Sequence, residues 1–145
     1  MRKGARVRLV LDTNVVLSGL IWHGHPRRLL DLAKEAAVSL YTSSALLDEL
    51  ADVLSREKWA ATLATRRTDA AYLMRRYGVL AKVIRPKRIG RVVPNDPDDD
   101  AVIACALAAR AELIVSGDKH LLGLGGQYQG IRIVAPAEAI QLIAG

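Results

Sequence analysis

The stretch RLVLDTNVVLSGL (Arg8–Leu20) begins with an apolar run that breaks at one acidic residue, Asp12. The run indicates a buried strand over Val7–Leu11, with Arg8 as an interruption that the strand tolerates. A carboxylate beside apolar neighbours costs free energy unless a partner or a cation compensates its charge. Asp12 therefore marks both the end of a strand and a candidate site.

Outward from this stretch, strands and helices alternate along the chain. Further strands are expected over Val38–Thr42, Leu113–Ser116 and Ile131–Val134, and helices over residues 27–37, 43–59, 68–83, 98–110 and 136–144. Such alternation is typical of an α/β fold. We expect a single domain, residues 1–145, with a mainly parallel central sheet of four to five strands and helices on both faces.

Composition excludes several classes of protein. A chain of 145 residues that is 51% hydrophobic can bury a substantial core. Its apolar runs are far shorter than the roughly 18 residues that a membrane crossing needs. The basic N-terminus precedes only a short apolar run, which argues against a signal peptide. With a single cysteine, Cys105, no internal disulfide can form, and we expect a cytoplasmic protein.

Positive charge is concentrated in one part of the chain. The net charge is +6, whereas residues 66–91 hold nine Lys or Arg residues and one acid, Asp69. The rest of the chain is therefore slightly acidic. A basic face of this kind suits a phosphate backbone, although solvated helix surfaces also carry such charge.

Two acids follow strands that are expected to be parallel. Asp12 follows the first strand, and Asp118 follows the strand in LIVSGDKH (Leu113–His120). In open parallel sheets, ligands bind outside the carboxyl ends of the strands. If these two strands are neighbours, the two carboxylates converge.

Two helices supply further acids. In the helix after Ser43, Glu49 lies at the margin of the apolar arc, whereas Asp48 and Asp52 point outward. In NDPDDDA, three consecutive aspartates exceed what helix capping requires. Asp98 is the natural cap, Asp100 should face the core side, and Asp99 fits either role.

The acids define the chemistry of the candidate site. Neither His nor Cys joins them at the spacing of a metal site. Oxygen ligands alone select hard cations, Mg²⁺ or Mn²⁺. Several carboxylates in a basic protein then indicate metal-assisted hydrolysis of a phosphodiester.

These segments resemble the PIN-domain ribonucleases, and within them the VapC-like toxins of toxin–antitoxin pairs. The matching stretches are LVLDTNVVLSGL (9–20), SSALLDELADVL (43–54), DPDDDAVIACALAARAELIVSGDKHLL (96–122) and IRIVAPAEAI (131–140). By this resemblance the catalytic, metal-binding acids are Asp12, Glu49, Asp100 and Asp118, with Asp99 as a further metal ligand. Thr13, Asn14 and Ser116 match polar positions that support the acids.

The resemblance also implies a mechanism and partners. A water activated by one or two Mg²⁺ or Mn²⁺ ions attacks the RNA phosphorus and leaves a 5′-phosphate and a 3′-hydroxyl. Family members form homodimers, and an antitoxin chain covers the acidic cleft. The basic segment then guides RNA, with Arg75, Arg76, Arg85, Lys87 and Arg88 as contacts and Trp22 as a stacking platform. For Trp59 we expect core packing.

Two other functions compete with this interpretation. The first is a phosphotransferase with Asp12 as covalent nucleophile, of the haloacid dehalogenase-like type. The pattern of that family requires a second Asp at the position where this chain has Asn14. The alternative is a catalytically silent PIN fold that binds RNA or a partner protein. All four acids are present, which favours the nuclease.

Overall fold

The computed structural model describes residues 6–86, 97–117 and 126–144, with side chains from residue 100 onward in the second range. Its strands are β1 (Val7–Leu11), β2 (Val38–Thr42), β3 (Ala81–Val83), β4 (Leu113–Val115), β5 (Gln127–Tyr128) and β6 (Ile131–Val134). Its helices are α1 (Thr13–Ile21), α2 (His25–Lys34), α3 (Ser44–Leu54), α4 (Glu57–Thr65), α5 (Ala70–Leu80), α6 (Pro97–Ala109) and α8 (Pro136–Ala144).

The described strands form one sheet in the order β3-β2-β1-β4-β6-β5. All neighbouring pairs are parallel except β5 and β6. β1 lies inside the sheet between β2 and β4, and its Leu11 pairs with Val115. The first and fourth strands are therefore neighbours, which brings their carboxyl ends together.

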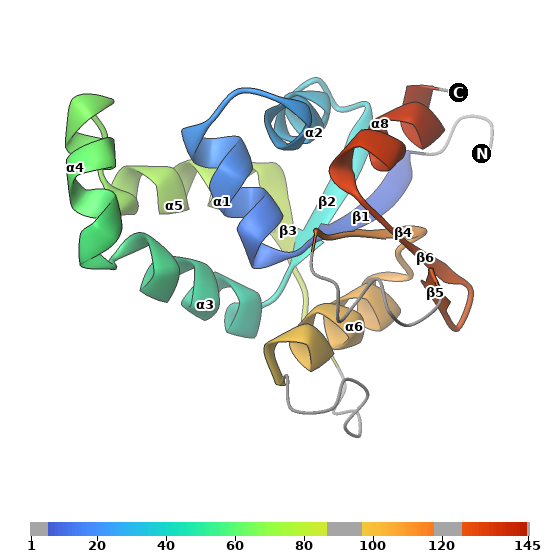
Figure 1. Cartoon of the computed structure of the whole chain (residues 1–145). Helices are drawn as coiled ribbons and strands as arrows, with labels where there is room; N and C mark the ends of the chain where they lie inside the picture. Colours follow the sequence, from blue (N-terminus) through green and yellow to red (C-terminus); the bar gives the residue numbers. More distant parts are fainter. Residues whose placement is uncertain (1–5, 87–96, 118–125, 145) are drawn as a thin grey trace.

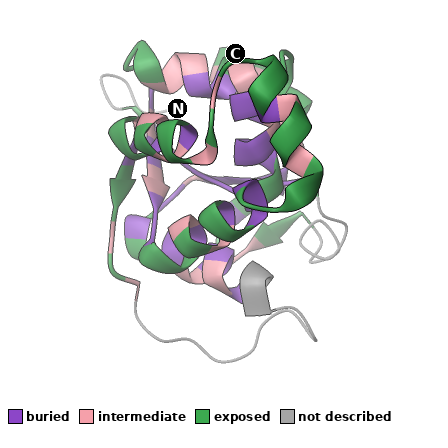
Figure 2. Cartoon of the chain, turned by 90° about the vertical axis from the view of Figure 1, so that its left-hand side faces the viewer, coloured by how far each residue is buried: buried purple, intermediate pink, exposed green. Residues whose placement is uncertain are grey.

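Helices cover both faces of the sheet, as the sequence predicts (Figure 1). Alternate side chains of each strand enter two different cores: Leu9 and Leu11 join the helices α1, α2, α5 and α8, whereas Val10 joins α6. This period of two is what a sheet buried on both faces requires. Figure 2 shows the same division in the helices, whose inner sides are buried and outer sides exposed. The predicted α/β class is confirmed.

The structure differs from the predicted elements in four places. Helix α1 was missed, because its Val15 and Val16 favour strands. The expected helix 43–59 is divided into α3 and α4, and the expected helix 68–83 ends at Leu80 and continues as β3. With β3 and the two-residue strand β5, the described sheet has six strands, whereas the sequence predicted four to five.

Candidate active site

Asp12 lies at the junction of β1 and α1. Its backbone is extended (φ −63°, ψ 152°) and its main-chain N–H donates to the oxygen of Val115 at 2.9 Å. Its own carbonyl accepts the N–H groups of Val15 and Val16, so it also begins the helix. Both the sheet and the helix therefore fix the Cα position of Asp12.

Hydrogen bonds fix the carboxylate as well. Oδ1 accepts the N–H of Thr13 at 2.8 Å, and Oδ2 accepts the hydroxyl of Ser116 at 2.9 Å. Asp12 is only 5% exposed. Donors to a carboxylate favour its charged form, and a charge at the N-terminus of a helix is further stabilised by the aligned peptide dipoles. The hydrogen bonds and the helix dipole are therefore partners of the kind that a buried carboxylate requires.

Ser116 reaches Asp12 because β1 and β4 are neighbours. It follows β4 directly, its N–H donates to the oxygen of Val134, and it is fully buried. Thr13 is also buried, and its Oγ1 is without a hydrogen-bond partner among the described residues. Asn14, in contrast, is exposed on α1. Two of the three predicted supporting residues therefore lie in the interior beside Asp12.

Glu49 lies in the second turn of α3, a helix whose start is fixed by Ser43. The hydroxyl of Ser43 accepts the N–H of Leu46 at 3.3 Å and so caps the helix. Leu46 and Leu50 are buried, and Glu49 between them is half-buried. α3 packs against both α1 and α6. Glu49 thus belongs to a helix that contacts both α1, which Asp12 caps, and α6, which carries Asp100.

Asp100 lies in the first turn of α6 and is 9% exposed. This helix crosses from β3 to β4, which are both parallel to β1, so it runs against the strands and begins near their carboxyl ends. The far end of α6 supports this direction: the guanidinium of Arg8, near the start of β1, donates to the oxygen of Ala109. Asp100 therefore lies at the same edge of the sheet as Asp12. It is buried, as the sequence predicts.

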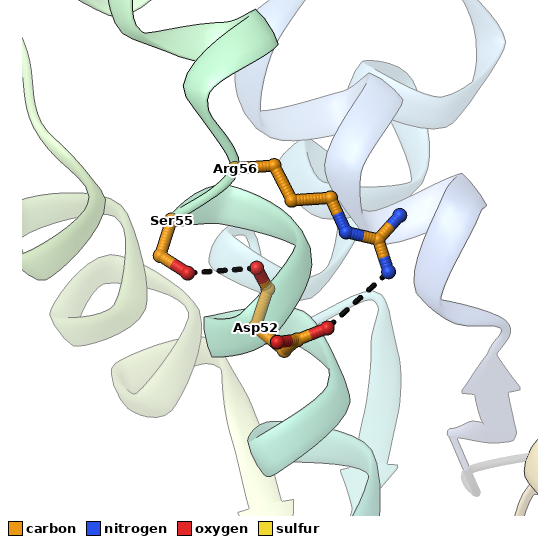
Figure 3. Close-up of polar contacts among 3 residues, drawn as sticks. All are labelled: Asp52, Ser55 and Arg56. Atoms are coloured by element: carbon orange, nitrogen blue, oxygen red, sulfur yellow. Dashed lines mark hydrogen bonds and ion pairs between the residues drawn. The ribbon is translucent and has the colours of Figure 1, made fainter.

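Asp48 and Asp52 show how the acids outside the site are used. Both are exposed on α3, as predicted. Figure 3 shows the hydroxyl of Ser55 donating to the main-chain oxygen of Asp52 at 2.8 Å and Arg56 Nη2 lying 3.2 Å from its carboxylate. An exposed pair of this kind contributes little stability. Asp52 therefore has the environment of an ordinary exposed helix acid, unlike the buried Asp12.

Several predicted residues lie outside the described residues. They are Asp118, Lys87 and Arg88, together with the side chains of Asp98 and Asp99. Among the side chains that the structure does describe, no three acids, histidines or cysteines come close enough to hold a metal ion. The described part thus shows a fixed Asp12 and a buried Asp100 at one sheet edge, and the assembly of the full acid set stays a prediction.

The predicted RNA contacts have different environments. Arg75 and Arg85 are exposed, Arg76 is half-buried, and Trp22 is 43% exposed. The ring of Trp22 is already stacked, because the guanidinium carbon of Arg66 lies 4.6 Å from its centroid. Trp59 packs against the main core, as predicted. The sequence interpretation did not single out Arg66, and only the three-dimensional structure brings it to Trp22.

Comparison with known proteins identifies the family. The family model of the PIN domain matches residues 8–120. An uncharacterized protein of Methanocaldococcus jannaschii is 29% identical over 129 residues, which cover 88% of this chain and 81% of that protein. No helix in the described ranges has the length and apolarity that a membrane crossing requires. PIN domains are in general nucleases that act on RNA and use divalent metal ions. The chain belongs to the PIN domain family.

Proposed function

We propose that this chain is a metal-dependent endoribonuclease whose catalytic acids are Asp12, Glu49, Asp100 and Asp118. The observation that carries the proposal is the carboxylate of Asp12, buried and held at 2.8 and 2.9 Å by Thr13 and Ser116. A carboxylate that is both buried and charged is expensive to maintain for stability alone. It is well suited to a site that receives a cation.

The donor chemistry of the site fits a hard divalent cation, Mg²⁺ or Mn²⁺. The candidate ligands are carboxylates, and Thr13, which follows Asp12 in the chain, adds a buried Oγ1 that has no hydrogen-bond partner among the described residues. Asp12, Glu49, Asp100 and Asp118 would hold the ion, with Asp99 as a further ligand. A cation bound there lowers the pKa of a nearby water and stabilises the charge that develops on the phosphate.

The chain's own residues position and protect the reacting groups. Ser116 and the N–H of Thr13 hold both carboxylate oxygens of Asp12 in one orientation, so no rotamer has to be selected during the reaction. The basic residues Arg75, Arg76, Arg85, Lys87 and Arg88 supply the attraction that brings RNA toward an acidic site. Trp22 contributes an exposed aromatic surface.

We further propose that the nuclease is the toxin of a toxin–antitoxin pair. The order of its acidic motifs resembles that of VapC-like toxins, although the run of aspartates at 98–100 is longer than in their common pattern, and an antitoxin would cover the acidic cleft. We propose a homodimer as its assembly. Val79 and Val83, on α5 and the edge strand β3, are 86% and 55% exposed, and such apolar surface suits a partner chain.

The test is cleavage of a mixed RNA pool by purified protein with Mg²⁺, with Mn²⁺ and with EDTA. Asp12→Asn is the decisive variant, because asparagine also caps helices and the fold should survive. Asp48→Asn is its matched control, an exposed acid on α3. We expect cutting that needs metal, persists in Asp48→Asn and disappears in Asp12→Asn.

Two results would reject the proposal. Equal cutting by the native protein and Asp12→Asn would show that a contaminating nuclease does the work. Metal-independent RNA binding without any cutting would favour the catalytically silent binding module instead.

A further inference from the structure

A hollow of about 400 Å³ lies at the end of α1 that is remote from Asp12. Its walls are the last turn of α1 with the loop to α2, the end of α4 and the first turns of α5. We call it the arginine pocket, because Arg27, Arg66, Arg67 and Arg76 line it. Asp12, Glu49 and Asp100 are not among its lining residues. The pocket is therefore separate from the acidic site.

The arginines of the pocket are not neutralised by acids. Within the described part of the chain, no carboxylate oxygen lies within 4.0 Å of their nitrogens. Asp69, the nearest acid in sequence, uses its Oδ1 to accept the N–H of Tyr72 at 2.8 Å. Four cations around one hollow repel each other, and a bound anion would remove that repulsion.

Three of the four arginines keep all of their side-chain donors for a ligand, within the part of the chain that the structure describes. Arg27 uses part of its guanidinium, because its Nε and Nη2 donate to the carbonyl oxygens of Gly19 and Leu20 and so cap α1. The guanidinium of Arg66 is held at the rim by its stack on Trp22. Arg66, Arg67 and Arg76 therefore remain as the groups that can bind an anion with their N–H forks.

Arg67 occupies a backbone position that normally favours glycine. It has φ 54° at the end of α4, where its N–H donates to Ala64 and that of Thr68 donates to Leu63. This is a Schellman ending, in which glycine is the usual residue. An L-residue in this conformation costs free energy, and here it adds a positive charge to the pocket.

The pocket wall also holds an aromatic side chain. Tyr72 is 48% exposed, so its ring and phenol are open to a ligand. Thr68, another wall residue, has an Oγ1 that protein atoms cover and that has no hydrogen-bond partner among the described residues. A phenol together with guanidinium groups is a recurrent set for a phosphate oxygen and an adjoining base.

We propose that the arginine pocket binds a phosphate group of single-stranded RNA, at a fixed distance from the cleavage site. α1 has nine residues and is about 13 Å long at about 1.5 Å per residue. At about 3.4 Å per stacked nucleotide, this length corresponds to about four nucleotides. The inference rests on the proposed function, because it names where the substrate of that function is held.

The observations favour RNA over an acidic peptide. A single carboxylate is satisfied by one bidentate arginine, whereas this pocket gathers four arginines. Basic residues are also frequent in the sequence around the pocket arginines, since residues 66–91 carry nine of them. A polyanion with regularly spaced charges matches that arrangement better than one carboxylate.

The experiment measures the affinity for a labelled 12-nucleotide single-stranded RNA in EDTA by fluorescence anisotropy over a range of salt concentrations. Arg76→Ala is compared with Arg132→Ala, an exposed arginine of β6 that does not line the pocket. We expect Arg76→Ala to weaken binding about tenfold and to lower the salt slope by about one, and Arg132→Ala to change affinity less than threefold.

A second variant separates binding from folding. Arg67→Gly removes the charge while relieving the left-handed backbone, so its thermal midpoint should not fall, whereas its RNA affinity should fall about tenfold. Ala36→Gly, at φ 61° after α2, is the control for the backbone change alone and should bind RNA as the native protein does.

Binding does not depend on cleavage, so the two proposals can fail separately. Loss of affinity in both pocket variants without any cutting by the native protein would keep the arginine pocket and reject the nuclease. Native RNA affinity in both variants would overturn the proposal that the arginine pocket binds RNA, even if the protein cuts RNA. Native RNA affinity combined with lost binding of an oligoglutamate peptide would overturn it in favour of a protein partner.

Discussion

The two ends of α1 differ in the charge of the residues around them and in how far those residues are buried. At its N-terminus, the carboxylate of Asp12 is 5% exposed and both oxygens are hydrogen-bonded. At its C-terminus, Arg66, Arg67 and Arg76 line an open hollow with side chains that are exposed or half-buried. Within the described ranges, Arg27 is the one arginine of the pocket whose side chain is hydrogen-bonded to the backbone.

The difference follows from what each chemistry requires. A catalytic group must be held within about half an ångström of its productive position, and only buried contacts achieve this. Phosphate binding is dominated by charge, which decays slowly with distance and tolerates flexible side chains. The acidic end is therefore built from sheet and helix backbone, and the basic end from long side chains around a helix ending.

The largest effect among the supporting residues should come from Ser116. Ser116→Ala removes the hydroxyl that lies 2.9 Å from Asp12 Oδ2 and should lower the cleavage rate about 10- to 100-fold. Ser116→Thr, which restores a hydroxyl, should recover much of that rate. Measurement of the rate against metal concentration checks this. A Ser116→Ala variant with native kinetics would show that the acidic end does not depend on its hydrogen bonds.

Gly19→Ala should disturb the basic end alone. A Cβ at Gly19 would lie 2.9 Å from Leu30 Cδ1 and 2.9 Å from the oxygen of Pro26, so α2 must shift away from α1. We expect a loss of about 1–2 kcal/mol in the free energy of unfolding. Gly78→Ala in α5 is the control, because its Cβ meets nothing within 4 Å and should stabilise the helix slightly. Equal effects in urea denaturation would contradict the close packing.

Two buried groups, Tyr77 in the core beside α1 and Cys105 in the core beside α6, set an alkaline limit to stability. Burial raises the pKa of the Cys105 thiol from 9.0 to about 12, and burial also raises the pKa of Tyr77. Above pH 9 the unfolded thiol loses its proton before the folded one, so stability is complete below pH 9 and falls as the pH rises toward 12. We expect a loss of about 1 kcal/mol between pH 9 and pH 10. Urea denaturation of Cys105→Ala should show a shallower dependence, and an identical slope would argue against this origin.

The smallest effect concerns the helix endings. Ala36 and Arg67 both have positive φ after α2 and α4. Ala36→Gly should raise the free energy of unfolding by up to about 1 kcal/mol, because glycine adopts this conformation without a steric penalty. Thermal denaturation measures the gain. A decrease would mean that the left-handed residue carries no strain here.

The strands and the position of Asp12 were predictable because local patterns decide them. The bounds of β2, β6 and α8 agree with the sequence expectation. The convergence of Asp12 and Asp118 was expected on the condition that their strands are neighbours. The sheet order places β1 beside β4, and Asp12 contacts Ser116 there, whereas Asp118 lies outside the described residues. The catalytic roles of Asp12, Glu49, Asp100 and Asp118 stay predictions.

The basic end could not be predicted in the same way. Arg27 reaches Gly19 only because α1 and α2 pack closely, and Arg66 reaches Trp22 across two separate segments. The expected helix 43–59 is divided at Ser55 and Arg56, and this break changes the position of the arginines that follow α4. Such long-range packing leaves no periodic signal in the sequence.

Single-turnover cleavage of a labelled RNA in Mn²⁺, with protein in excess, tests the central claim most directly. The native protein, Asp48→Asn and Asp12→Asn are compared at equal RNA occupancy. The account predicts that Asp48→Asn cleaves within about twofold of the native rate, whereas Asp12→Asn is at least about 100-fold slower with unchanged RNA affinity. Cleavage by Asp12→Asn at the native rate would contradict it, because the most firmly held acid of the site would then have no part in the reaction.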